Sequence, residues 1–244
     1  MEQRNATAAV IGAGDYIGSA IARKFASQGY TLVAGRRNGD QLATLKGEIE
    51  AAGGVCHARS LDARKEEDIT AFLAEADAIA PLEVCVFNVG ANVNYPILDT
   101  TERVFRKVWE MACYGGFLTG REAARHMVEH GKGSIFFTGA TASIRGGIGY
   151  AAFASAKFGL RAVAQSMARE LGPKNIHVAH LVIDSGVDTA WVRERRKAAG
   201  GGDIVEPDQL MNPSSIAEAY WTLHTQQRDG WTFELDLRPY GERW

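Results

Sequence analysis

The chain has 244 residues, of which 46% are hydrophobic and 23% are charged. This composition suffices for one well-buried core and excludes a disordered, collagen-like or coiled-coil protein. Because 27 Lys and Arg residues stand against 29 Asp and Glu residues, the net charge is -2, and neither nucleic acid nor a membrane surface is expected as a partner. No apolar run reaches the roughly 18 residues of a membrane span. The three cysteines are widely spaced, and no charged-then-apolar leader precedes Ala6, which favours a reducing, cytoplasmic setting.

Segments with strand character alternate with segments of helical periodicity along the chain. The apolar run 6–11 ends in a glycine cluster, after which apolar residues recur at helical spacing up to position 28. Further strands are predicted at 30–34, 55–60, 83–88, 134–138, 177–183 and 231–237, and further helices at 42–52, 69–76, 101–129, 151–171 and from 214 onward. Because parallel strands need helical crossovers, this alternation predicts a single α/β domain over residues 1–244, with a doubly wound parallel sheet.

One long segment, 184–212, has no clear periodicity. Long irregular segments in compact domains often cover a functional site, so we expect this segment to be a lid over a small-molecule substrate. Its candidate apolar contacts to the substrate are Trp191 and Met211, and Phe153 from the helix 151–171 is a further candidate.

A glycine-rich turn follows the first predicted strand, with the sequence Gly12-Ala13-Gly14-Asp15-Tyr16-Ile17-Gly18. Glycines at such a turn let a pyrophosphate approach the backbone amides at a helix N-terminus, although a turn without any ligand can have the same pattern. Asp15 would place a carboxylate near the phosphates unless its side chain turns outward or caps the helix. Tyr16 fits two interpretations equally well, a ring packed over the turn or a lid over the pyrophosphate.

Two arginines, Arg36 and Arg37, follow the second predicted strand, where NAD-binding proteins usually carry an acidic residue. Guanidinium groups there suit a ribose 2′-phosphate and favour NADP over NAD, while adjacent arginines on a surface turn are also common as solvated charges. Asp62, just past the third predicted strand, is a candidate acceptor for an adenine amino group or, alternatively, a helix cap.

These features resemble the short-chain dehydrogenase/reductase family. The likeness extends to three later stretches, Phe87-Asn88-Val89-Gly90, Phe153-Ala154-Ser155-Ala156-Lys157 and Val187-Asp188-Thr189. The resemblance implies a Rossmann-like fold, a nicotinamide cofactor along the carboxyl edge of the sheet, and a homodimer or homotetramer. It also implies, together with the glycine turn and the arginines, the following cofactor-binding residues: Gly12, Gly14, Asp15, Tyr16, Ile17, Gly18, Arg36, Arg37, Asp62, Asn88, Gly90, Lys157, Val187 and Thr189.

The sequence departs from this family at the positions that normally carry its chemistry. The family uses an Asn, a Ser, a Tyr and a Lys, and here only Lys157 remains, because the other three positions hold Ala112, Ala140 and Phe153. A phenyl ring has no proton to give, and alanine side chains cannot hold a carbonyl oxygen. The family's usual ketone reduction therefore cannot run as it normally does.

Tyr150 is the candidate replacement for the lost proton donor. It lies seven residues before Lys157, so the two side chains share one helix face if the helix includes both. This spacing resembles that of the divergent enoyl reductases, in which hydride is added to a carbon and a tyrosine polarises the oxygen of the forming enolate. The simpler interpretation is that Tyr150 only closes the mouth of the pocket.

We therefore expect an NADP-dependent oxidoreductase with Tyr150 and Lys157 as catalytic residues and a small carbonyl or enone compound as substrate. The alternatives are a catalytically inactive NADP-binding sensor or scaffold protein and, less favoured, a non-redox lyase or isomerase. No metal site is expected. The segment His126-Met127-Val128-Glu129-His130 matches a short inverted zinc-protease pattern, but it ends a predicted helix, where basic side chains suit the helix dipole.

Overall fold

The computed structural model describes residues 3–198, 200 and 208–242. Seven parallel strands form one sheet in the order β3-β2-β1-β4-β5-β6-β7, which confirms the predicted single α/β domain with a doubly wound parallel sheet. The strands are β1 (Thr7–Ile11), β2 (Thr31–Arg36), β3 (Cys56–Ser60), β4 (Leu82–Phe87), β5 (Gly133–Thr138), β6 (Ile176–Ile183) and β7 (Glu234–Leu237).

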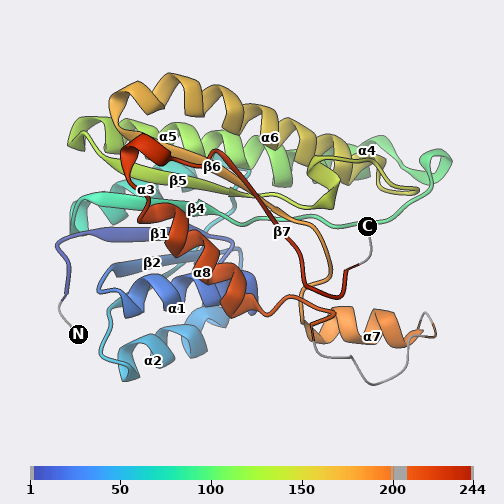
Figure 1. Cartoon of the computed structure of the whole chain (residues 1–244), viewed down its shortest axis with the longest axis horizontal. Coiled ribbons are helices and arrows are strands. Elements are labelled where there is room, and N and C mark those ends of the chain that lie inside the picture. The colour runs from blue at the N-terminus through green and yellow to red at the C-terminus, as the bar shows by residue number, and fades with distance from the viewer. Residues whose placement is uncertain (1–2, 199, 201–207, 243–244) are drawn as a thin grey trace.

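Helices cover both faces of this sheet (Figure 1). The helices α1, α2 and α8 contribute buried residues to one apolar cluster, and α3, α5 and α6 contribute to the other. The helix bounds are α1 (Ile17–Ser27), α2 (Ala43–Ala51), α3 (Glu66–Ile79), α4 (Glu102–Trp109), α5 (Gly115–His130), α6 (Ala151–Leu171), α7 (Ala190–Ala198) and α8 (Pro213–His224).

Strand β1 shows why the sequence forms this three-layer arrangement. Its Ala8 and Val10 pack into one apolar cluster, and its Ala9 and Ile11 pack into the other. Because successive side chains of a strand point to opposite faces, a strand covered on both sides is expected to be apolar on both sides. The apolar residues 8–11 fit this expectation, and the buried Thr7 at the start of the strand donates a hydrogen bond from its hydroxyl to the Ala80 oxygen.

Two predicted segments differ in detail from the structure. The helix predicted over 101–129 is interrupted by one π-helical turn, Glu110–Tyr114, between α4 and α5. Such turns are frequent at functional sites, and this one carries the fully buried Ala112. The irregular segment 184–212 contains the helix α7, which stands apart from the two helix layers (Figure 1). Residues 199 and 201–207 of that predicted lid lie outside the described residues.

The carboxyl ends of the strands gather the predicted site residues at one edge of the sheet. The connections from β1 and from β4 leave toward opposite halves of the sheet, so a crevice forms where these neighbouring strands end. The glycine turn follows β1, Asn88 follows β4, and Ala140 follows β5. Among the described residues, no helix is both long and apolar enough to cross a membrane.

Candidate active site

The glycine turn after β1 is held by tight backbone contacts. Gly12 has a φ of 88°, and a Cβ there would lie 2.8 Å from the carbonyl group of Asn88. The Asn88 side chain donates a hydrogen bond from Nδ2 to the Gly12 oxygen at 3.0 Å. A Cβ at Gly18 would lie 2.2 Å from that same oxygen. Only glycine fits at positions 12 and 18, because the strand, the turn and the helix approach one another too closely for a side chain.

Gly14 differs from these two glycines because it faces open space. A Cβ there would meet no other group within 4 Å, and Gly14 lies in the lining of two cavities. Helix α1 begins just beyond it, with no side-chain hydrogen bond at its N-cap residue Tyr16 and no acidic residue in its first turn. A helix N-terminus of this kind attracts an anion such as a phosphate.

The carboxylate of Asp15 is turned away from the turn. It accepts a hydrogen bond from Arg36 Nη1 at 2.9 Å, and its side chain is 71% exposed. The Asp15 side chain is thus exposed and paired with Arg36, and it does not cap helix α1. Arg36 and Arg37 themselves border a cavity of about 470 Å³, together with Asn38 and Gln41, and we call it the β2–β3 cavity.

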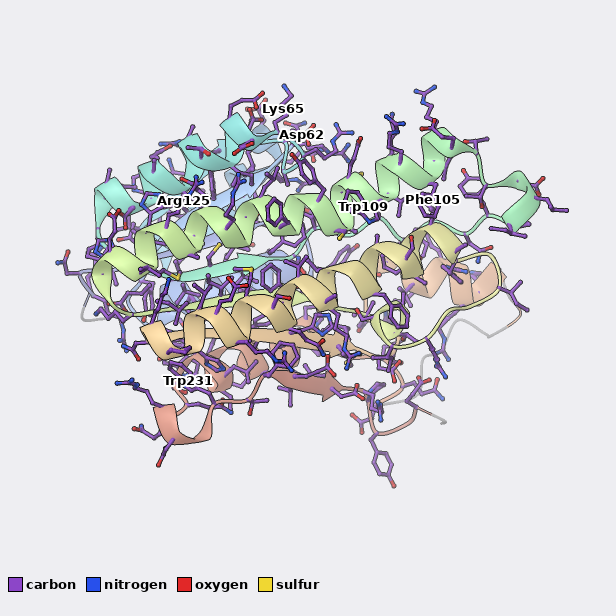
Figure 2. All side chains as sticks on the ribbon, turned by 90° about the horizontal axis from the view of Figure 1, so that it is seen from above. Asp62, Lys65, Phe105, Trp109, Arg125 and Trp231 are labelled. Atoms are coloured by element: carbon purple, nitrogen blue, oxygen red, sulfur yellow. The ribbon has the colours of Figure 1, made fainter. Side chains whose placement is uncertain are left out.

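Asp62 borders the same cavity but is already engaged by a neighbour. Arg64 Nε donates to both carboxylate oxygens of Asp62, at 2.9 Å and 3.1 Å. These hydrogen bonds are the main reason that the pKa of Asp62 lies below its usual value. Helix α3 starts after Lys65 without a side-chain cap, so Asp62 does not cap its first turn; Figure 2 shows Asp62 and Lys65 close together there.

Two further cavities continue the β2–β3 cavity along the sheet edge. The central cavity, of about 730 Å³, shares Gly12, Gly14, Asn88 and Gly90 with the β2–β3 cavity. The Tyr150 cavity, of about 560 Å³, adjoins the central one through the shared residues Asn92, Ala140, Phe153, Ile183 and Ser185. The three cavities form one groove from the β2–β3 end of the sheet to the β5–β6 end.

Lys157 lies in the lining of the central cavity and is only 3% exposed. Its ammonium group donates to the carbonyl oxygens of Thr138, at 2.7 Å, and Val89, at 3.3 Å. Burial lowers the pKa of this amine from 10.5 to about 8. The group is thus fixed by two backbone oxygens at the carboxyl end of β5 and just beyond β4.

Tyr150 and Phe153 occupy the same end of the groove as Lys157. Tyr150 is the residue just before α6, and its side chain borders the Tyr150 cavity. Phe153, one helical turn further on, borders both that cavity and the central one. The Lys157 ammonium lies 5.9 Å from the centre of the Phe153 ring. The phenyl ring is therefore the part of α6 that lies between the lysine and the tyrosine.

Helix α7 reaches across from the glycine turn to Tyr150. The amide of Ala190, its first residue, donates to the Tyr16 hydroxyl at 3.2 Å, and Arg195 Nη2 donates to the Tyr150 hydroxyl at 2.9 Å. Val187, Thr189 and Trp191 all border the central cavity. Tyr16 thus contacts the segment predicted as a lid and also borders the central cavity.

Met211 has a different place from the one expected of a substrate contact. It is 7% exposed and belongs to the apolar cluster under α1 and α8. Val187 and Met211 pair through a parallel β-bridge, and Met211 does not border any of the three cavities of the groove. Its side chain packs into the apolar cluster, and its backbone pairs with the segment that precedes α7.

Several polar residues of the groove were missed by the sequence reasoning. Ser185 borders both the central and the Tyr150 cavity, and its hydroxyl donates to a carboxylate oxygen of Glu242 at 2.6 Å. Asn92, Arg145 and Arg195 also belong to these linings. Asn92 and Ser185 follow β4 and β6, so their place at carboxyl ends of parallel strands was the signal that could have found them.

The zinc-like histidine pair has a structural role. His126 Nδ1 and His130 Nε2 contact the two carboxylate oxygens of Asp77, at 3.2 Å and 2.7 Å. Within the described ranges, no group of three or more His, Cys, Asp or Glu side chains is arranged to hold a metal ion. The pair links α5 to α3.

Comparison with known proteins agrees with this fold. A family model described as short chain dehydrogenase matches residues 6–200. The chain belongs to the short-chain dehydrogenase/reductase family and has its Rossmann-like fold.

Individual relatives are similar over nearly the whole chain. A crystal structure of a short-chain dehydrogenase from Rhodopseudomonas palustris is 63% identical, with 97% of this chain and 100% of that chain covered and a TM-score of 0.84. A metagenomic short-chain oxidoreductase in complex with NADP is 25% identical, with coverages of 97% and 98% and a TM-score of 0.82. An uncharacterized oxidoreductase, YuxG of Bacillus subtilis (strain 168), is 31% identical over 83% of this chain, which spans only 30% of the length of YuxG.

Proposed function

We propose that the protein is an NADP-dependent oxidoreductase with an altered active site, which acts on a small carbonyl or enone compound. The observation that carries this proposal is the groove itself. Its central cavity holds the buried Lys157, and the adjoining Tyr150 cavity holds a tyrosine hydroxyl. The two cavities meet at Phe153, so a cofactor at the lysine and a substrate at the tyrosine would be neighbours.

The residues of the groove fit a nicotinamide dinucleotide. Gly12 and Gly18 keep the backbone close, and the open space at Gly14 leaves room for phosphates at the start of α1. Arg36 and Arg37 would receive a ribose 2′-phosphate in the β2–β3 cavity, and a family member 25% identical to this chain is known in complex with NADP. Asp62, Asn88, Gly90, Val187 and Thr189 line the rest of the path. When bound, NADPH supplies a hydride for a carbon of the substrate.

Tyr150 is the proposed proton donor. Its oxygen accepts a hydrogen bond from Arg195, which leaves the hydroxyl's own proton free to point at a substrate oxygen. Ala112, Ala140 and Phe153 provide no proton at the positions where the family carries its Asn, Ser and Tyr. In the reduction of an enone, hydride is added to the carbon-carbon double bond and the protein only polarises the neighbouring carbonyl oxygen. This reaction needs less from those three positions than the reduction of a ketone does.

The segment 184–212 is the proposed substrate lid. Trp191, at the start of α7, borders the central cavity and is 52% exposed, and Phe153 borders both that cavity and the Tyr150 cavity. A substrate held at Tyr150 and covered by this segment would be shielded from water, which strengthens the hydrogen bond from Tyr150.

Calorimetric titration with NADPH and with NADH is the first test. Micromolar NADPH binding with much weaker NADH binding is expected. A screen of enones and carbonyl compounds with Tyr150→Phe should then show turnover at least ~100-fold lower than in the unchanged protein, with NADPH affinity retained. Tyr240→Phe, at a tyrosine that is exposed and outside the groove linings, is the matched control. Equal turnover in Tyr150→Phe would remove Tyr150 from the mechanism.

The second candidate function is a catalytically inactive NADP-binding sensor or scaffold protein. The apolar residues at positions 112, 140 and 153 favour it. They stand in place of side chains that donate or hold protons, and they do not alter the end of the groove proposed for the phosphates. Its signature would be NADPH affinity with no turnover of ketones, aldehydes or enones. That result would replace the oxidoreductase proposal.

A homodimer or homotetramer is proposed on the basis of exposed aromatic rings. Phe105 and Trp109 on α4 are each 40% exposed, and Phe117 on α5 and Phe158 on α6 are exposed to a similar extent. Figure 2 shows Phe105 and Trp109 on the same helix. Burial of such rings between subunits is a common source of interface stability, and light scattering of the purified protein measures the resulting mass.

A further inference from the structure

Arginine side chains gather around the Tyr150 cavity. Arg145, in the loop after β5, borders this cavity. Arg195, on α7, borders the central cavity and donates a hydrogen bond to the Tyr150 hydroxyl at 2.9 Å. Two arginines from segments 50 residues apart in the chain (195 minus 145) thus border the part of the groove proposed for the substrate.

The charge of these two arginines is not balanced by acidic neighbours. In the part of the chain that the structure describes, no carboxylate forms an ion pair with Arg145 or Arg195. Arg193, two residues earlier on the same helix, instead binds the Asp188 carboxylate through two hydrogen bonds, at 2.5 Å and 2.8 Å. The described linings of the central and Tyr150 cavities contain one carboxylate, Asp15, which pairs with Arg36 at the glycine turn. The carboxylate of Glu242 lies behind the lining, where it accepts a hydrogen bond from the Ser185 hydroxyl.

The walls of the Tyr150 cavity strengthen this positive field. They include the side chains of Phe153, Ile183 and Ala142, and of these Phe153 and Ile183 are almost fully buried. Charges beside apolar walls are screened less than charges in open water, and guanidinium groups suit the planar geometry of a carboxylate. Both arginines are exposed in the structure, so a negatively charged ligand would gain this extra attraction when it fills the cavity and excludes water from it.

We propose that the substrate carries a carboxylate, which Arg145 and Arg195 bind at the Tyr150 cavity. Naming this ligand a substrate rests on the oxidoreductase function proposed above. The cofactor's own phosphates are the other possible source of negative charge, but the Tyr150 cavity has no residue of the glycine turn in its lining. Arg36 and Arg37 lie at the opposite end of the groove. With its carboxylate at the arginines, the substrate would extend past Tyr150 toward Phe153 and Lys157.

The test compares two ligands of nearly the same shape, trans-cinnamate and the neutral trans-cinnamamide. Both are titrated calorimetrically into the full-length protein, with and without saturating NADP⁺, which cannot reduce them. We expect cinnamate to bind at least about tenfold more tightly than cinnamamide. Arg145→Gln and Arg195→Gln should each weaken cinnamate binding about tenfold and leave cinnamamide binding unchanged, since a charge-assisted hydrogen bond is lost. Arg195→Lys should retain part of the affinity.

Arg228→Gln is the matched control, because Arg228 is exposed and lies outside the groove linings. Thermal melting of each variant shows whether it folds. Equal affinity for the acid and the amide, an absence of binding by both, or arginine variants that bind cinnamate normally would overturn the proposal. Failure of the protein to bind NADP⁺ would instead refute the oxidoreductase function. In that case the difference in affinity between cinnamate and cinnamamide would still show whether the two arginines form a carboxylate site.

Discussion

The two ends of the groove are built in different ways. At the end where we propose that the cofactor's phosphates bind, called the phosphate end below, the shape is set by backbone contacts, because Gly12 and Gly18 have no space for a side chain and Asn88 holds the Gly12 oxygen. The carboxyl ends of strands also form the reaction end, but the chemistry there depends on single side chains such as Phe153 and Tyr150. A backbone cradle is maintained by the fold as a whole, whereas reactivity changes with one or two substitutions. Cofactor binding and chemistry can therefore be tested separately in this protein.

The largest expected effect comes from filling the open space at Gly14. Gly14→Leu would place a side chain where phosphates are proposed to bind, so we expect the dissociation constant for NADPH to rise at least ~100-fold. The melting temperature should change little, because a Cβ at this position meets no neighbour. Gly47→Leu, at an equally open glycine on α2, is the control and should bind NADPH normally. Normal affinity in Gly14→Leu would place the cofactor elsewhere.

A smaller effect is expected from the buried amine at the junction of the two ends. Since burial lowers the pKa of Lys157 from 10.5 to about 8, the unfolded chain binds more protons than the folded one between these pH values. The contribution of Lys157 to the free energy of unfolding therefore becomes more favourable as pH rises from 8 toward 10.5. Between pH 7 and pH 9.5, the free energy of unfolding of the unchanged protein should therefore rise by about 2 kcal/mol relative to that of Lys157→Met.

Urea denaturation of both proteins at the two pH values measures this difference. Comparing the two proteins removes the opposing contributions of other groups, such as the buried tyrosines and cysteines whose pKa values are raised by burial. Equal changes of the free energy of unfolding in the two proteins would mean that the pKa of Lys157 is not lowered and that its amine is not desolvated.

The smallest expected effect is a gain of activity at the reaction end. Phe153→Tyr would place a hydroxyl group between Lys157 and the Tyr150 cavity, at the position where the family carries its tyrosine. Reduction of cyclohexanone by NADPH should rise about tenfold, below the usual contribution of a general acid, because Ala140 still cannot hold the carbonyl oxygen. Phe158→Tyr, on the exposed side of α6, is the control. No gain would mean that the missing hydroxyl is not what limits ketone reduction.

The sheet was predictable because its strands carry an explicit signal. The strands buried on both faces are mainly apolar, although β6 also buries His177 and His180, and the order of strands and helices leaves few topologies for a parallel sheet. Helix α7 could not be predicted in the same way. None of its described residues is buried, so its sequence has no apolar stripe, which is the pattern by which helices are recognised.

The candidate site was predictable where neighbours in space are neighbours in sequence. Tyr150, Phe153 and Lys157 lie on or beside one helix, so their spacing placed them together. The hydrogen bond from Arg195 to Tyr150 joins residues 45 positions apart, and that from Ser185 to Glu242 joins residues 57 positions apart. Contacts of this kind depend on how loops fold back over the sheet edge, which no local pattern in the sequence records.

Two tyrosine hydroxyls tie helix α7 to the sheet edge, Tyr16 at its first residue and Tyr150 through Arg195 further along the helix. Each of these hydrogen bonds contributes on the order of 1 kcal/mol, so each can break without the other. If the hydrogen bond between Arg195 and Tyr150 breaks first, the reaction end of the groove opens while the phosphate end stays closed. We therefore expect ordered kinetics, with the product leaving before the oxidised cofactor, and product inhibition patterns that show it.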